Sequence, residues 1–134
     1  MPVQRSERLP IRSSEHIVQV RQAVREWSQV VGFSLVDQTK MVTAASELAR
    51  NTLTYGGGGD VLLEELQEGL RRGLRLTFED QGPGIPDINL ALKDGYTTGG
   101  GLGLGLSGSK RLVNEFEIDS RPGEGTRVTV ARWK

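Results

Sequence analysis

The chain has 134 residues, 17 of them Lys or Arg and 17 Asp or Glu, which suits one domain over residues 1–134 with a single core. Cysteine is absent and His16 is the lone histidine, which excludes disulfides, thiol nucleophiles, thiolate metal sites and a zinc site made of several histidines. The net charge is zero, and no apolar run approaches the roughly 18 residues of a membrane span. The N-terminus is polar and broken by prolines, unlike a signal peptide. We therefore expect a cytoplasmic protein with no nucleic-acid or membrane partner.

The first half of the chain reads as a strand followed by two helices. Short alternation over Val3 to Ile11 predicts an edge strand, where proline is tolerated. A helix capped by Ser13 or Ser14 then runs to Gly32 with one apolar stripe, formed by Ile17, Val20, Val24, Trp27 and Val31. A second helix opens at Ser34 in a variant of the capping box, and its apolar face carries Met41, Ala45, Leu48 and Thr52.

The second half alternates strands with glycine-rich turns. Tyr55 and the run Gly56 to Gly59 end the second helix, and strands are expected over residues 60–67, 74–80, 116–120 and 126–133, with Val128 and Val130 facing inward. A turn is expected over 68–73, a short helix over 88–94, a glycine-rich loop over 96–107 and a helix from about 106 to 115. These elements predict a two-layer α/β sandwich, a mostly antiparallel sheet with helices on one face.

The strand that ends at Asp80 delivers this acid into the turn Asp80-Gln81-Gly82-Pro83-Gly84. A carboxylate accepts hydrogen bonds from amines, so Asp80 could bind an exocyclic amino group such as that of adenine. Gly82 and Gly84 let the backbone approach a flat ligand and adopt positive φ. Taken alone, the pattern is more often an ordinary loop after a strand.

A second candidate site lies in the glycine-rich stretch that precedes the helix from 106. Its backbone N–H groups can converge on an anion such as a phosphate, with help from the following helix N-terminus. The context excludes both a P-loop and a Rossmann motif, and a merely flexible loop stays an alternative. The residues concerned are Gly99, Gly100, Gly101, Leu102, Gly103, Leu104 and Gly105.

Glu47 and Asn51 are spaced i, i+4 in the second helix and therefore share one face, one turn apart. An amide oxygen is a hard ligand that suits Mg²⁺, and a neighbouring carboxylate can orient or deprotonate a hydroxyl or water. The alternative is a solvated polar face.

The series Glu47-x-x-x-Asn51, Asp80-x-Gly82-x-Gly84, Gly101-x-Gly103-x-Gly105 and Gly125-Thr126 resembles the nucleotide-binding boxes of the GHKL ATPases. The resemblance covers nearly the whole chain and implies the Bergerat sandwich, a mostly antiparallel mixed sheet with helices on one face. It also implies ATP and Mg²⁺ as ligands. Asn51 is implied as the Mg²⁺ ligand, Glu47 as the catalytic base, Asp80 as the adenine-binding acid, and Thr126 as a support of the adenine pocket.

Within that family the small size and the segment Asp94 to Thr98 resemble the RsbT-like serine/threonine-protein kinases of the anti-sigma regulatory factor type. This resemblance implies a stressosome-like partner-switching pathway, with STAS-domain proteins as substrates and a PP2C-type phosphatase as the activated partner. Arg50, beside the second-helix pair, is implied as a partner contact or else faces solvent. Residues 95–109 contain no Lys or Arg, so Lys93 and Lys110 are candidates for the cation that phosphoryl transfer needs.

One other function remains as the alternative, an anti-sigma factor that sequesters a sigma factor and phosphorylates its antagonist. A clamp ATPase is disfavoured, because it needs a transducer domain and a long lid. A sensor histidine kinase is excluded as an expectation, because the sequence shows no dimerisation helices and His16 lacks the context of a phosphoacceptor histidine.

Overall fold

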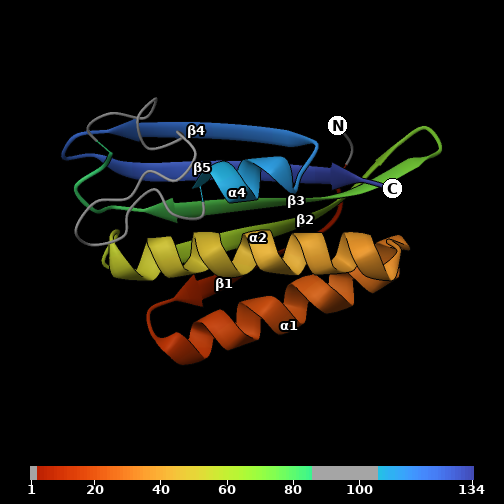
Figure 1. Ribbon diagram of the computed structural model, residues 1–134, viewed down its shortest axis with the longest axis horizontal. Helices are drawn as coiled ribbons and strands as arrows, with labels where there is room; N and C mark the ends of the chain where they lie inside the picture. The colour runs from red at the N-terminus through yellow and green to blue at the C-terminus, as the bar shows by residue number, and fades with distance from the viewer. Residues whose placement is uncertain (1–2, 86–105) are drawn as a thin grey trace.

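The computed structural model describes residues 3–85 and 106–134. Its sheet has five strands in the order β1-β2-β3-β5-β4, and every pairing in this described part is antiparallel. Helices α1, α2 and α4 lie on one side of the sheet (Figure 1). The elements are β1 (Val3–Ile11), α1 (Ser14–Val31), α2 (Leu35–Thr54), β2 (Gly59–Glu68), β3 (Arg71–Asp80), α4 (Leu106–Arg111), β4 (Glu115–Arg121) and β5 (Gly125–Trp133).

The two-layer sandwich predicted from the sequence is therefore confirmed. The parallel pairing implied by a mixed sheet does not occur among the described strands. None of the described helices is long and apolar enough to cross a membrane.

The ends of α1 and α2 follow from local chemistry. Ser13 is the N-cap of α1, and Gly32 ends this helix in the left-handed region at φ 94°. In α2 the side chain of Ser34 accepts a hydrogen bond of 3.1 Å from the backbone N–H of Asp37, as the capping-box variant predicts. The buried faces of both helices contain the apolar residues expected there, except that Ile17 is only partly buried.

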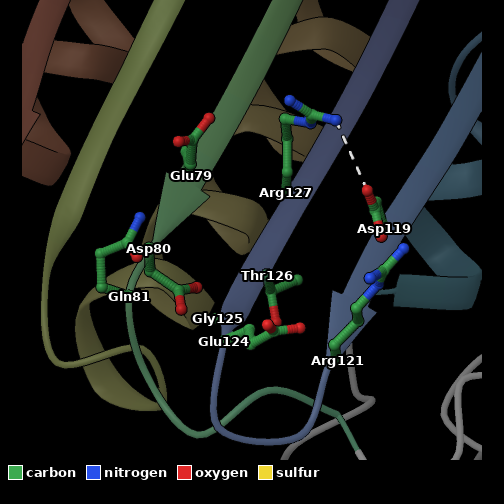
Figure 2. A pocket seen from close by; sticks show the side chains of 9 residues that line it. All are labelled: Glu79, Asp80, Gln81, Asp119, Arg121, Glu124, Gly125, Thr126 and Arg127. Atoms are coloured by element: carbon green, nitrogen blue, oxygen red, sulfur yellow. Dashed lines mark hydrogen bonds and ion pairs between the residues drawn. The ribbon is translucent and has the colours of Figure 1, made fainter.

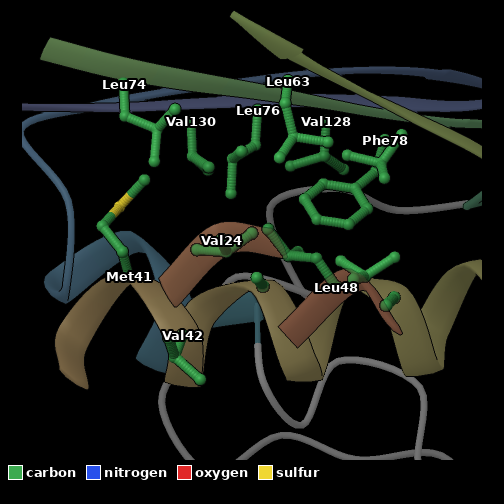
Figure 3. Packing of buried hydrophobic residues seen from close by; sticks show 14 of the residues in the cluster. Val24, Met41, Val42, Leu48, Leu63, Leu74, Leu76, Phe78, Val128 and Val130 are labelled. Carbon is green, nitrogen blue, oxygen red and sulfur yellow. The ribbon is translucent and has the colours of Figure 1, made fainter. Parts of the chain in front are cut away.

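The core lies between the helices and one face of the sheet (Figure 3). Met41 and Leu48 of α2 and Val24 of α1 point toward the inner faces of β3 and β5, because alternate residues of each strand turn to the helices. The sheet contributes fully or almost fully buried side chains, namely Val61, Leu63, Leu74, Leu76, Phe78, Val128 and Val130.

The outer face of the sheet carries a smaller cluster around Trp133, at the end of β5. Leu66, Gly73 and Trp133 are cross-strand neighbours, and Leu66 is fully buried. A Cβ at Gly73 would lie 2.7 Å from the indole, so glycine makes room for the ring. The Arg71 guanidinium lies 4.5 Å from the ring centroid, and the indole N–H donates to Glu115 at 2.7 Å. These contacts fix β5 against both of its neighbours.

Two of the expected boundaries were wrong. The turn expected over 68–73 is much shorter, because β2 and β3 continue pairing to Glu68 and Arg71. The helix expected to reach residue 115 ends at Arg111. Asn114, just before β4, already bonds to β5: its N–H donates to the Ala131 carbonyl at 2.9 Å, and its side-chain oxygen accepts from the N–H of Trp133 at 2.7 Å. The short helix expected over 88–94 lies outside the described residues.

Candidate functional site

Three polar residues form a row across the sheet at one end of its helix-facing side. Asp80 of β3 pairs with Thr126 of β5, and Thr126 pairs with Ser120 of β4. Because strand residues two apart share a face, this row continues the inner positions of Phe78 and Val128. Figure 2 shows the side chains of Asp80 and Thr126 on their neighbouring strands.

A cavity of about 130 Å³ opens above this row, between the sheet and α2. Its walls are mainly apolar, and its polar groups come from only a few side chains. Such a lining suits a flat ring whose edge carries hydrogen-bonding groups. The lining residues are Leu48, Asn51, Thr52, Tyr55, Gly56, Phe78, Asp80, Pro83, Gly84, Ile85, Leu106, Thr126 and Val128.

Asp80 is the acidic residue of this cavity and is only 9% exposed. Burial raises its pKa above the ordinary value of 3.8, because the charged form loses hydration; backbone N–H groups of Gly82 and Thr126 oppose this shift. The Gly82 N–H donates to Oδ1 at 2.9 Å and holds the carboxyl in place. The acid therefore stands in the cavity wall with acceptor capacity to spare for a ligand donor.

Glycine is needed around Asp80 because backbone segments pack there without room for a Cβ. A Cβ on Gly56 would collide with the Asp80 carboxyl, and one on Gly82 would lie 2.7 Å from the Gly56 Cα. Gly84 has φ 78°, and a Cβ there would collide with the carbonyl oxygen of Arg121. These close contacts within the protein fix the loop that follows β3.

Asn51 lies on α2 and faces the same cavity. Its side-chain nitrogen is buried and has no hydrogen-bond partner, which is costly unless a ligand or water supplies one. The neighbouring Thr52 is satisfied within the helix, since its hydroxyl donates to the Leu48 carbonyl at 2.9 Å. The unpaired amide makes Asn51 a candidate for ligand binding, and turning about its last bond presents oxygen in place of nitrogen.

Asn51 also fits a magnesium ion held together with phosphates. Among the described residues no group of three or more His, Cys, Asp or Glu side chains gathers that could bind a metal by itself. Mg²⁺ in proteins typically takes one or two side-chain oxygens and completes its shell with water and substrate phosphates. One amide oxygen at the cavity matches that pattern.

Glu47, the expected catalytic base, lies outside the cavity lining, one helical turn before Asn51. Its Oε1 pairs with the guanidinium of Arg50 at 2.9 Å, and the two side chains are 38% and 55% exposed. The structure thus brings Asn51, Asp80, Gly84 and Thr126 together and leaves the carboxylate of Glu47 accessible from solvent. Gly99 to Gly105 and Lys93 lie outside the described residues, while Lys110 is exposed on α4.

Residue spacing alone did not identify Ser120. Its hydroxyl accepts from the backbone N–H of Ile85 at 2.7 Å and lies 2.7 Å from the hydroxyl of Thr126. The alternation of Phe116, Ile118 and Ser120 along β4 was the available signal, because it places Ser120 on the inner face.

A second hollow of about 250 Å³ lies behind the row, where Glu79, Asp119, Glu124, Arg121 and Arg127 gather (Figure 2). These charged side chains give it no apolar wall for a ring. Arg127 and Asp119 form an ion pair there with an N–O distance of 3.5 Å, and both side chains are more than half exposed. The cavity next to α2 is therefore the better candidate site.

Comparison with known proteins identifies the family of this chain. A family model described as histidine kinase-, DNA gyrase B-, and HSP90-like ATPase matches residues 36–134. The serine/threonine-protein kinase RsbT of Bacillus subtilis (strain 168) is 47% identical over 117 residues, which cover 87% of this chain and 88% of that kinase. An anti-sigma F factor of Thermoanaerobacter sp. (strain X514) is 29% identical over 96 residues, covering 68% and 66% of the two chains.

Two solved structures share the fold. A crystal structure of the RsbU and RsbW domains of a Mycobacterium tuberculosis protein aligns with a TM-score of 0.65 at 21% identity, covering 98% of this chain and 33% of that one. The mycobacterial sensor histidine kinase MprB aligns with a TM-score of 0.57 at 19% identity, covering 96% and 97%.

Proposed function

The chain belongs to the family of histidine kinase-, DNA gyrase B- and HSP90-like ATPases, and we propose that it is an ATP- and Mg²⁺-dependent serine/threonine-protein kinase. Its fold is the Bergerat (GHKL) sandwich of that family. In this proposal it works in the cytoplasm in a stressosome-like partner-switching pathway, phosphorylates a STAS-domain protein and then activates a PP2C-type phosphatase. The observation that carries the proposal is 47% identity with a named RsbT kinase over 87% of the chain.

The cavity supports adenine as the ligand base. Leu48, Phe78 and Val128 offer apolar surface to the ring, and Asp80 offers an acceptor to the exocyclic amino group. A hydrogen bond to a carboxylate contributes about 1.5–3 kcal/mol, roughly twice a neutral one. Asp80 therefore supplies both affinity and the choice of an amino-bearing base.

Asn51 and Glu47 support the chemistry of phosphoryl transfer from one face of α2. The amide oxygen of Asn51 would hold a magnesium ion, which neutralises charge on the phosphates. Glu47 accepts the proton of the substrate hydroxyl as the oxygen–phosphorus bond forms and the bond to the leaving nucleoside diphosphate breaks. Its partly exposed position suits this role, because a protein substrate must bring its hydroxyl from outside.

A second candidate function is an anti-sigma factor that sequesters a sigma factor and phosphorylates its antagonist. The 29% identity with an anti-sigma F factor favours it. The greater identity and coverage with RsbT favour the switch kinase. A co-purification from the host that recovers a sigma factor in place of a phosphatase would reverse this preference.

Transfer of labelled phosphate from ATP to a cognate STAS-domain protein tests the proposal. We expect wild-type protein to transfer label, and Glu47→Ala to lower the rate by about 10²–10⁴ while ATP affinity stays within about twofold, because the base acts mainly in the transition state. Glu26→Ala, an exposed glutamate on α1, is the matched control and should behave as wild type. ATP binding with no transfer to any host STAS-domain protein would contradict the kinase assignment.

A further inference from the structure

Ser120 connects three segments around the cavity without lining it. Its oxygen lies 2.7 Å from the N–H of Ile85, 2.7 Å from the hydroxyl of Thr126 and 3.2 Å from the carbonyl oxygen of Gly125. The side chain is half-buried, at the inner face of β4. One hydroxyl therefore ties together the loop after β3, the start of β5 and its own strand.

Counting donors fixes the direction of these hydrogen bonds. A serine hydroxyl has one proton and two acceptor sites, and the Ile85 N–H occupies one of the acceptor sites. All three contacts can be hydrogen bonds only if Ser120 donates to Gly125 and Thr126 donates to Ser120. In the opposite arrangement Ser120 and the Gly125 carbonyl would face each other as two acceptors, which is unfavourable away from water.

This arrangement decides what Thr126 can offer to the cavity. Its only proton points away toward Ser120, so the hydroxyl presents acceptor sites alone. Asp80, its cross-strand neighbour, is an acceptor whenever it is ionised. On the sheet side of the cavity, the polar groups of Asp80 and Thr126 are thus two adjacent acceptors.

We propose that Ser120 is a positioning residue that sets the base selectivity of the cavity, by holding the Thr126 proton away from the ligand. The inference rests on the proposed nucleotide-binding function and deepens it. Two acceptors favour a base that brings an amino group to Asp80, with a water donating to both Thr126 and the neighbouring ring nitrogen. Adenine matches this edge, whereas hypoxanthine brings a carbonyl oxygen against it and is rejected.

Removal of the Ser120 hydroxyl releases this constraint. The Thr126 hydroxyl can then turn and donate into the cavity, where it stabilises a carbonyl oxygen as readily as a ring nitrogen. Ser120→Ala should therefore lower affinity for ATP and relax discrimination against ITP. A purely structural role would weaken both nucleotides equally, so the ratio of the two affinities separates the two explanations.

Dissociation constants for ATP and ITP, measured by calorimetry on the full chain with Mg²⁺, test the inference. We expect wild type to prefer ATP by about 10- to 150-fold, and Ser120→Ala to reduce this preference by about tenfold, the effect of one hydrogen bond. Ser120→Thr restores the hydroxyl and should keep the ratio within about threefold of wild type. If the alanine variant does not fold, Ser120→Cys fills the site with a weaker donor and acceptor and should lower the preference in the same direction, by a smaller factor.

A double-mutant cycle shows whether Ser120 acts through Thr126. In a Thr126→Val background, Ser120→Ala should leave the ATP-to-ITP ratio unchanged, because no hydroxyl remains to redirect. An unchanged ratio in Ser120→Ala alone, or an effect that persists without the Thr126 hydroxyl, would overturn the inference and leave the kinase proposal standing. Wild-type protein that binds neither nucleotide would overturn both.

Discussion

Replacing Asp80 with asparagine should weaken nucleotide binding without destabilising the folded protein. The buried carboxylate is a strong acceptor for a ligand, but its burial destabilises the fold. Asparagine is nearly isosteric and keeps an oxygen that can accept from the Gly82 N–H, the 2.9 Å bond that holds the side chain. It removes the charge that burial disfavours and also removes the charged acceptor for the ligand. Affinity should fall while the free protein keeps or gains stability.

The loss of affinity follows from the value of a hydrogen bond to a charged group, about 1.5–3 kcal/mol, which corresponds to roughly a 10- to 150-fold increase in the ATP dissociation constant. The gain in stability should be modest. An increase of about 1 kcal/mol corresponds to a rise in melting temperature of about 4 °C for a domain of this size.

The pH dependence of unfolding tests whether the charge on Asp80 destabilises the folded protein. Burial raises the folded-state pKa of Asp80 above 3.8. The contribution of Asp80 to folding stability is therefore fully present below pH 3.8 and is lost as the pH rises through the folded-state pKa. The stability of Asp80→Asn relative to wild type should therefore increase across this window and then level off.

Thermal melts across the acidic-to-neutral range, with calorimetric titration of ATP at neutral pH, measure both quantities. A nucleotide-free variant that is less stable than wild type at neutral pH would refute the argument that Asp80 carries a burial cost. Unchanged ATP affinity would remove Asp80 from the binding site.

Two further substitutions test the packing around the site. Gly56→Ala should raise the ATP dissociation constant by more than about tenfold, because the added Cβ must displace the Asp80 carboxyl. Gly108→Ala is the control in both ATP titration and thermal melting, because a Cβ there meets no neighbour. Equal ATP affinities for the two variants would contradict the clash at Gly56. Arg132→Met should destabilise the fold by about 2 kcal/mol in chemical denaturation, since it breaks partly buried bonds of 2.7 Å to Asp37 and 2.9 Å to the Leu112 carbonyl. Arg127→Met removes only an exposed pair and should stay within about 0.5 kcal/mol, so similar losses in both arginine variants would show that burial is not the cause.

Local signals predicted the helices well and the strand ends less well. Gly32 ends α1 through its left-handed backbone and Ser34 caps α2 through its side chain, and both signals are readable in a short stretch of sequence. Ser13 stands at the predicted N-cap of α1 but makes no side-chain cap hydrogen bond. The shortened last helix was missed because Asn114 is recruited by β5, a partner that lies 17 and more residues away along the chain. Long-range pairing decided that boundary, and no local pattern reports it.

In the candidate site too, local signals predicted some residues and missed those that depend on long-range contacts. Asp80, Asn51 and Thr126 were identified by residue type and motif order, and the cavity contains all three. Ser120 and Gly56 were missed as site residues, because their importance comes from the neighbours that the fold gives them. Ser120 matters through its contacts with Ile85 and Thr126, and Gly56 through the space it leaves for Asp80.

The order of the strands has a consequence for biosynthesis. β5 follows β4 in the chain but lies between β3 and β4 in the sheet. While the ribosome is still translating residue 124, the nascent polypeptide has an unpaired edge at β3, and β4 has no sheet partner. Asp80 has Thr126 beside it only once β5 pairs with β3, so the cavity is incomplete without the last strand of the chain.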